Sequence, residues 1–215
     1  MTDFARLRTG MVDCQIRVAD VTDHRVLGAF LTVERERFVP ESRRGLAYLD
    51  TRTPLAPGRA TMEPMTLAKL IQLADPQPNE RALVVGAGLG YTAALLAHLV
   101  AEVVALESDP ELAAGARAAL SSLPNVAVVE GPLPDGAPSE GPFDLIFCDG
   151  AVSDGLDGLA RQLAPGGRIV APWGGVRPGK AAVFRLNGGE LSAAPAFDAA
   201  APALPGFERI EAFAL

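Results

Sequence analysis

Three glycines, Gly86, Gly88 and Gly90, stand at alternate positions between a short apolar run, 82–85, and an Ala/Leu-rich segment, 91–100. The run is too short for a helix and has strand-forming residues, whereas the segment after the glycines suits a helix. Glycines let the backbone turn sharply and bring its N–H groups close to a ligand. Strand, glycine turn and helix together predict the first unit of a nucleotide-binding α/β sheet.

A glycine turn alone is a weak signal, because a strand-to-helix loop that binds no ligand has the same pattern. Glu107 strengthens the interpretation, since it ends the next apolar run, 102–107. Its distance of about 20 residues from the turn is the spacing expected of an acceptor for ribose hydroxyls. A solvated acid at a strand end is the alternative. Together the two features favour a cofactor that contains adenosine.

Composition excludes several kinds of site and partner. The net charge of −7, from 19 basic and 26 acidic residues, argues against a dedicated nucleic-acid binder, which needs a basic face. Cys14, Cys148 and two histidines fit no metal-ligand spacing, so we predict no metal site. No stretch resembles a signal sequence or reaches membrane-spanning length. We therefore expect a cytoplasmic protein that does not bind membranes.

The chain before the glycine turn is expected to supply helices and a substrate-side loop. Apolar spacing predicts a helix over 3–15 and a second helix, which Thr22 or Asp23 could cap and which ends before Pro40. Residues 45–60 are rich in breakers and predict an extended, turn-rich connection. Connections of this length inside a compact domain are usually functional.

After the glycine turn, strands alternate with helical segments at a period typical of a parallel, doubly wound sheet. Later strands are predicted over 126–129, 143–148 and 168–172, a helix over 156–163, a turn over 165–167, a hairpin of 182–186 with 190–192, a low-complexity loop over 193–205 and a last strand over 208–214. All 215 residues are expected to form a single domain, in which 1–60 are the helices and loop and 61–215 the cofactor-binding sheet.

Several short motifs occur in a fixed order, within a similarity that runs from about Val12 to Gly174. They are Phe38-Val39-Pro40, Ala47-Tyr48 with Asp50, Pro54-Leu55, Gly58 through Pro64, Gly86 through Tyr91, Pro142-Phe143-Asp144, Gln162-Leu163, Gly166-Gly167-Arg168, and Pro172 with Gly174. This series resembles the protein-L-isoaspartate (D-aspartate) O-methyltransferase family. The resemblance implies an α/β, doubly wound Rossmann-like fold with a seven-stranded, mostly parallel sheet and an N-terminal helical segment. It also implies S-adenosyl-L-methionine as cofactor.

The family's reaction, carried over by resemblance, methylates the free carboxylate of isoaspartyl residues in damaged proteins, and the ester then closes to a succinimide that can reopen to aspartate. By position, the turn residues Gly86, Ala87, Gly88, Leu89 and Gly90 would line the cofactor. Glu107, with Ser108 beside it, would hold the ribose hydroxyls. An acceptor carboxylate is already ionised at neutral pH, so the enzyme has mainly to align it with the methyl group.

Several positions depart from the family pattern. Met62 stands where family members usually have a serine that faces the substrate, and Ala60 replaces a threonine. Thr61 offers a hydroxyl one position out of register, which on an extended segment would point to the other face. We take Thr61 and Met62 as the candidate catalytic positions. Val84 and Pro132 stand where the family usually has acidic residues beside the cofactor.

These departures keep other hypotheses open. The chain could bind an adenosyl ligand without catalysis, or it could methylate a different acceptor. An NAD-dependent enzyme would share the glycine turn but not the other motifs. Arg59 is either a partner for a substrate carboxylate or a solvated loop arginine, and Asp149 is either a substrate contact or a helix-capping acid. The oligomeric state is not predicted.

Overall fold

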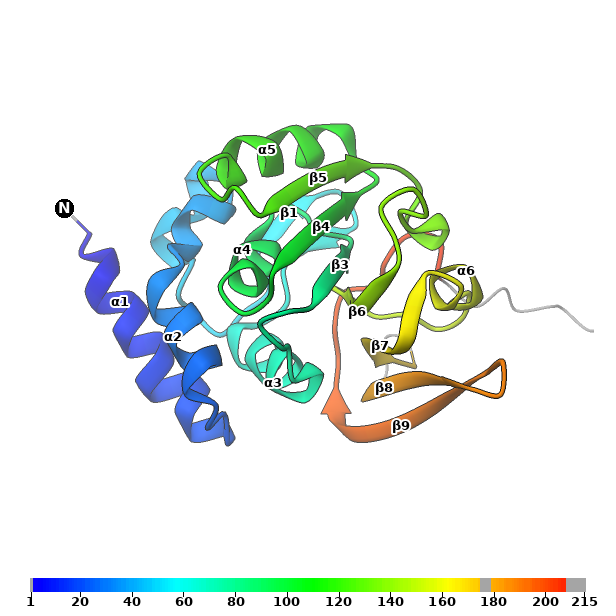
Figure 1. The fold of residues 1–215 in the computed structure, drawn as a ribbon. Helices are drawn as coiled ribbons and strands as arrows, with labels where there is room; N and C mark the ends of the chain where they lie inside the picture. The colour runs from blue at the N-terminus through cyan, green and yellow to red at the C-terminus, as the bar shows by residue number, and fades with distance from the viewer. Residues whose placement is uncertain (1, 175–178, 208–215) are drawn as a thin grey trace, which may run out of the picture.

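The computed structural model describes residues 2–174 and 179–207, with a seven-stranded sheet at their centre (Figure 1). The strands, in the order in which they lie side by side, are β5 (Val126–Glu130), β4 (Glu102–Glu107), β3 (Arg81–Val85), β6 (Phe143–Cys148), β7 (Leu163–Trp173), β8 (Gly179–Asn187) and β9 (Glu190–Ala199). The first five are parallel, and β8 and β9 are antiparallel additions at one edge. The predicted mostly parallel, seven-stranded sheet is confirmed.

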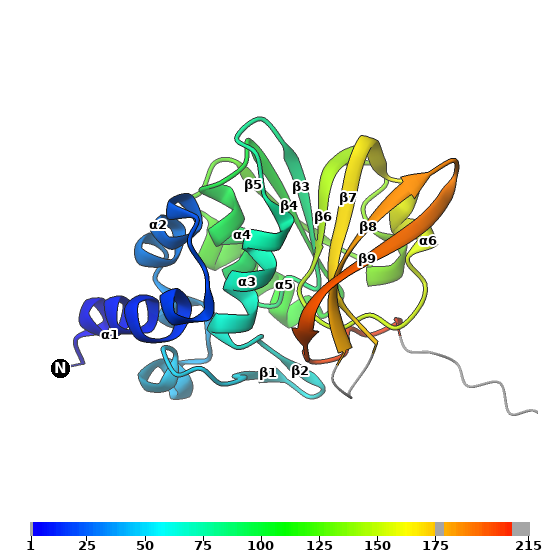
Figure 2. The same ribbon diagram turned by 90° about the horizontal axis from the view of Figure 1, so that it is seen from below.

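Helices cover both faces of the sheet, as Figure 2 shows for α3 (Pro64–Ala74) and α4 (Tyr91–Ala97) on one side and α6 (Asp157–Ala160) on the other. Alternate residues of a strand point to opposite faces. In β3, Ala82 and Val84 therefore enter one buried cluster, and Leu83 and Val85 enter the other. This two-sided burial explains the continuous apolar runs that made the strands recognisable in the sequence.

The N-terminal segment is helical. It consists of α1 (Phe4–Met11), which continues as a π-helical turn (Val12–Ile16) and a short 3₁₀ turn (Arg17–Ala19), then α2 (His24–Thr32) and the 3₁₀ helices η3 (Arg35–Phe38) and η4 (Glu41–Leu46). Asp23 begins α2 as its N-cap and accepts a hydrogen bond from the Arg25 amide at 2.8 Å. Val26 and Phe30 of α2 are fully buried, and they belong to the same cluster as Ala82 and Val84 of β3. These helices therefore complete the core on the α3–α4 side.

The predicted connection over 45–60 is more regular than expected. It contains a short hairpin of β1 (Pro54–Ala56) and β2 (Arg59–Ala60), which turns at Gly58 with φ +72°. The breakers that suggested a loop thus make a hairpin turn, because glycine takes a positive φ without steric cost. The hairpin places the β2 residues next to the glycine turn.

Three predictions after β6 need correction. The helix expected over 156–163 is only α6, since the chain is already extended at Leu163, and β7 runs through the expected turn at 165–167 with an irregularity in its pairing to β6. The expected loop over 193–205 is strand as far as Ala199, because its backbone pairs with β8. Its Pro195 is tolerated because β9 is an edge strand. The strand expected over 208–214 lies outside the described residues.

Two further helices complete the description. They are α5 (Pro110–Leu120), which begins at its N-cap Asp109, and the 3₁₀ turn η5 (Leu133–Asp135). α4 ends at Ala97, slightly before the predicted end of that helix. Within 2–174 and 179–207, no helix is both long enough and apolar enough to cross a membrane.

Candidate active site

The glycine turn lies at the carboxyl end of β3, where the sheet changes its direction of winding between β3 and β6. Ligands of open α/β sheets bind outside the strand ends at such a point. Gly86, Gly88 and Gly90 have φ values of +80°, +58° and +96°, which other residues rarely adopt. A Cβ on Gly88 would also approach Leu55 Cδ1 to 2.8 Å. The positive φ therefore favours glycine at this position, and a larger side chain would have to move Leu55.

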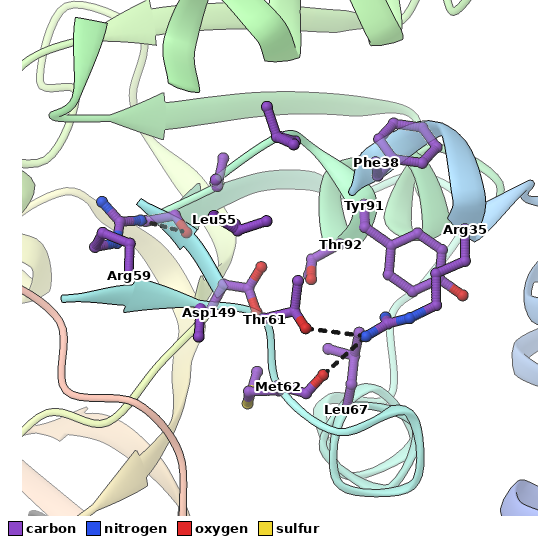
Figure 3. Close-up of a pocket in the computed structure, with 15 residues that line it drawn as sticks. Arg35, Phe38, Leu55, Arg59, Thr61, Met62, Leu67, Tyr91, Thr92 and Asp149 are labelled. Carbon is purple, nitrogen blue, oxygen red and sulfur yellow. Dashed lines mark hydrogen bonds between the residues drawn. The ribbon is translucent and has the colours of Figure 1, made fainter. Parts of the chain in front are cut away.

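The turn borders a cavity of about 20 Å³, which is room for a single water molecule. The predicted residues that line it are Thr61, Met62, Gly86, Ala87, Gly88 and Leu89 (Figure 3). Gly90 is not among its lining residues and packs toward Leu120 instead. Residues far apart in the sequence are thus brought together as expected, around a space that is nearly closed.

Glu107, at the end of β4, is completely buried beneath the turn. Its carboxylate accepts hydrogen bonds from the backbone amides of Gly88 at 2.7 Å, Ser108 at 2.8 Å and Asp109 at 3.0 Å. Burial alone would raise the pKa of Glu107, but the Arg59 guanidinium and the amides of Asp109 and Gly88 outweigh burial and lower it. Glu107 is therefore an ionised acceptor at neutral pH, as the ribose-binding hypothesis requires.

Arg59 has a partner that the sequence did not suggest. Its Nη1 and Nη2 lie 2.5 and 2.7 Å from the two carboxylate oxygens of Glu107, and Nη2 also donates to the Gly86 carbonyl at 3.3 Å. The residue is only 9% exposed, so the solvated-arginine interpretation is wrong. The signal that sequence reasoning missed is the hairpin, which carries a loop residue across to the end of β4.

Thr61 and Met62 follow β2 and are held by Arg35. Arg35 Nη2 donates to Thr61 Oγ1 at 3.1 Å and to the Met62 carbonyl at 3.0 Å, as drawn in Figure 3. Thr61 Oγ1 accepts a second hydrogen bond from the Thr53 amide. Its hydroxyl is thus engaged in holding the loop, while the Met62 side chain, 1% exposed, presents an apolar surface to the cavity.

Arg35 itself was not anticipated, because an arginine after an apolar helix gives no distinctive signal. It is 1% exposed, its guanidinium lies 4.6 Å from the centre of the Tyr91 ring, and its Nη1 has no hydrogen-bond partner in the described chain. The buried Tyr91 Oη and Thr92 Oγ1 lack a partner there as well. Arg35, Tyr91 and Thr92 all line the cavity, so its wall on this side carries polar groups.

Asp149 follows β6 directly and lines the cavity opposite Arg35 (Figure 3). Burial raises the pKa of Asp149 to about 6, even though Thr92 and the positive charges of Arg59 and Arg35 act in the opposite direction. No helix begins at Asp149, so the helix-capping interpretation is wrong. A carboxyl group that titrates near neutral pH beside the glycine turn is a feature of a functional site.

No acidic residue compensates for Val84 and Pro132, the two positions where family members usually have acids. Val84 is fully buried in the core, and Pro132 begins the η5 turn. Glu130, the nearest acid to Pro132 in sequence, is paired with Arg117 at 3.5 Å. In the described part of the chain, Glu107 and Asp149 are the acids that lie beside the turn and its cavity.

Comparison with known proteins gives a consistent result. The family model "Protein-L-isoaspartate(D-aspartate) O-methyltransferase" matches residues 8–194. Protein-L-isoaspartate O-methyltransferases from Koribacter versatilis and Aeropyrum pernix are 38% and 43% identical over 89% and 79% of this chain, and over 87% and 67% of their own lengths. The fold is similar to that of a Plasmodium falciparum protein solved with S-adenosyl-L-homocysteine, with a TM-score of 0.74 at 19% identity over 95% of this chain and 99% of that one. The chain belongs to the protein-L-isoaspartate (D-aspartate) O-methyltransferase family.

Proposed function

We propose that this chain is an S-adenosyl-L-methionine-dependent methyltransferase that acts on the free carboxylate of isoaspartyl residues in proteins. The observation that carries the proposal is the ionised carboxylate of Glu107, buried beneath the glycine turn at the carboxyl end of the sheet. Family membership supplies the reaction class. The polar and charged residues that line the cavity, Arg35, Thr92 and Asp149 among them, supply the reason to expect a ligand at this place.

The residues present fit an adenosyl group, provided that Arg59 leaves Glu107. Gly86 and Gly88 keep side chains away from the turn, and Glu107 offers the oxygens that ribose hydroxyls would need. When bound, S-adenosyl-L-methionine supplies a methyl group that is already activated for transfer. The protein's task is then to hold the acceptor carboxylate in line with that group and to exclude water.

The acceptor side is formed by the segment after β2. The Arg35 guanidinium is buried without a carboxylate in ion-pairing range in the described chain, so it offers positive charge to an incoming carboxylate. Met62 closes the cavity with an apolar side chain. Thr61 acts by holding this segment, since its hydroxyl is already engaged with Arg35 and Thr53. We therefore propose that Arg35 attracts the substrate carboxylate and that Thr61 positions the segment after β2.

A second candidate function is adenosyl-ligand binding without methyl transfer. It is favoured by Met62, which puts a thioether where family members usually have a hydroxyl, and by the hydrogen bonds that already engage the Thr61 hydroxyl.

We expect the cytoplasm as the compartment, because Cys14 and Cys148 are both free thiols.

The test is transfer of a labelled methyl group to an isoaspartyl peptide and to the normal aspartyl peptide of the same sequence. Base-labile label on the isoaspartyl peptide alone would support the repair reaction. Label on neither peptide, despite cofactor binding, would support the binding role. Label on both peptides would contradict the proposed acceptor and direct the search to other carboxylates.

A further inference from the structure

We propose that Arg59 sets the affinity of this chain for its adenosyl cofactor, because it occupies the ribose-hydroxyl acceptor and must be displaced before the cofactor binds. This inference rests on the proposed function for the identity of the ligand. Arg59 reaches Glu107 from the β1–β2 hairpin, which packs over the glycine turn. The hairpin therefore blocks the cofactor site, and the ion pair of Arg59 with Glu107 holds it in place.

The carboxylate of Glu107 has no acceptor capacity left for a ligand. It receives two hydrogen bonds from Arg59 and one each from the amides of Gly88, Ser108 and Asp109. An ionised carboxylate offers about four lone-pair positions. The amides belong to the backbone that forms the site, so Arg59 is the partner that can be exchanged for two ribose hydroxyls.

Space is limited by the same hairpin. The cavity of about 20 Å³ is far below the roughly 300 Å³ of the smallest usual ligand pockets. Leu55 of β1 lies directly over Gly88, with its Cδ1 2.8 Å from where a Cβ would be, and Arg59 of β2 lies over Gly86 and Glu107. A single displacement of this short hairpin would free the Glu107 carboxylate and open space above the glycine turn.

A two-stranded hairpin is a suitable element for such a movement. It has three residues in one strand and two in the other, and its turn at Gly58 is exposed. Hairpins of this size are marginally stable on their own, so its position depends on what it contacts. Arg59 provides the only ion pair of β1 and β2 in the described chain, and removing it should free the hairpin.

The experiment compares wild-type protein with Arg59→Gln by calorimetric titration with S-adenosyl-L-homocysteine. The substituted glutamine keeps a polar side chain but loses the charge and the paired donors, and three amides remain to hold Glu107. We expect the Kd of the variant to be at least ten times lower than that of the wild type, which corresponds to about 1.4 kcal/mol. The matched control is Arg52→Gln, which removes a partly exposed ion pair to Glu63 just before the hairpin and should leave the Kd unchanged.

A second readout uses the wild-type protein alone. The Nη–H₂ groups of an ion-paired arginine rotate slowly, so they give NMR signals of their own. The signals that disappear in Arg59→Gln are those of Arg59. Saturation with S-adenosyl-L-homocysteine should shift or broaden them, because the guanidinium leaves Glu107. This readout does not depend on how stable the variant is.

Several results would overturn the proposal. They are an equal or weaker affinity in Arg59→Gln, the same tightening in Arg52→Gln, no binding by any of the proteins, or Arg59 signals that stay unchanged at saturation. Failure of the proposed function gives a different result. Arg59→Gln would then bind S-adenosyl-L-homocysteine more tightly than the wild type, as expected, but neither protein would methylate the isoaspartyl peptide.

Discussion

Asp149→Asn should stabilise the folded protein at neutral pH. Burial raises the pKa of Asp149 to about 6, against about 3.9 in an unfolded chain. A group with a raised folded pKa contributes stability below its unfolded pKa and loses that contribution as the pH rises through its folded pKa. Two pKa units correspond to about 3 kcal/mol. Because the carboxylate faces a cavity, we expect about 1–3 kcal/mol to be recovered when asparagine removes the charge.

The assay is urea unfolding of both proteins between pH 4.5 and pH 7.5. The free energy of unfolding of Asp149→Asn should exceed that of the wild type at pH 7.5, and the difference should shrink toward pH 4.5. Glu107 acts in the opposite direction, because its lowered pKa gives stability that is lost as the pH falls, but it is present in both proteins and cancels in the difference.

The control is Asp157→Asn, which removes an exposed carboxylate in the first turn of α6 and so shows what the loss of one surface charge does at each pH. A difference between wild type and Asp149→Asn that is constant with pH would refute the reasoning. So would a variant less stable than the wild type at pH 7.5, since the charge of Asp149 would then be stabilising through Arg35 or Arg59.

Other variants test the site and its support. Gly88→Val should abolish the thermal shift given by S-adenosyl-L-homocysteine, because of its positive φ and the contact with Leu55, whereas Gly45→Ala, which meets no atom, should keep the shift; a retained shift in Gly88→Val would put the ligand elsewhere. Met62→Ser should raise the rate of methyl transfer to an isoaspartyl peptide while lowering the free energy of unfolding by about 2–4 kcal/mol through the lost buried side chain; an unchanged rate would mean that the loop no longer fits a repair substrate. Tyr48→Phe removes the hydroxyl that donates to Glu36 and should cost about 1–3 kcal/mol in urea unfolding, and an unchanged midpoint would contradict that role.

The sheet could be predicted from the sequence because its strands are buried on both faces. Runs such as those of β3 and β6 are mostly apolar, and the glycine turn and Asp109 mark the places where helices must begin. The β9 strand could not be predicted over its full length, because Ala and Pro after Ser192 give no strand signal. Pairing with β8 decides its conformation, and pairing is a property of the folded sheet.

The site was predictable where it depends on the backbone and unpredictable where it depends on side-chain partners. The glycine turn and Glu107 follow from local spacing, and both lie where that spacing indicated. Arg59 and Arg35 come from segments whose position is set by tertiary packing, so their contacts with Glu107 and Met62 had no sequence signal. Their roles toward a ligand stay predictions.

The most direct test of the central claim is a calorimetric titration of the wild-type protein and of Glu107→Gln with S-adenosyl-L-methionine. The wild type should bind one equivalent saturably, and Glu107→Gln should bind at least ten times more weakly, because it loses the ionised acceptor beneath the glycine turn. Binding of equal strength by the two proteins, or no binding by the wild type, would contradict the claim that this turn and this carboxylate form the cofactor site.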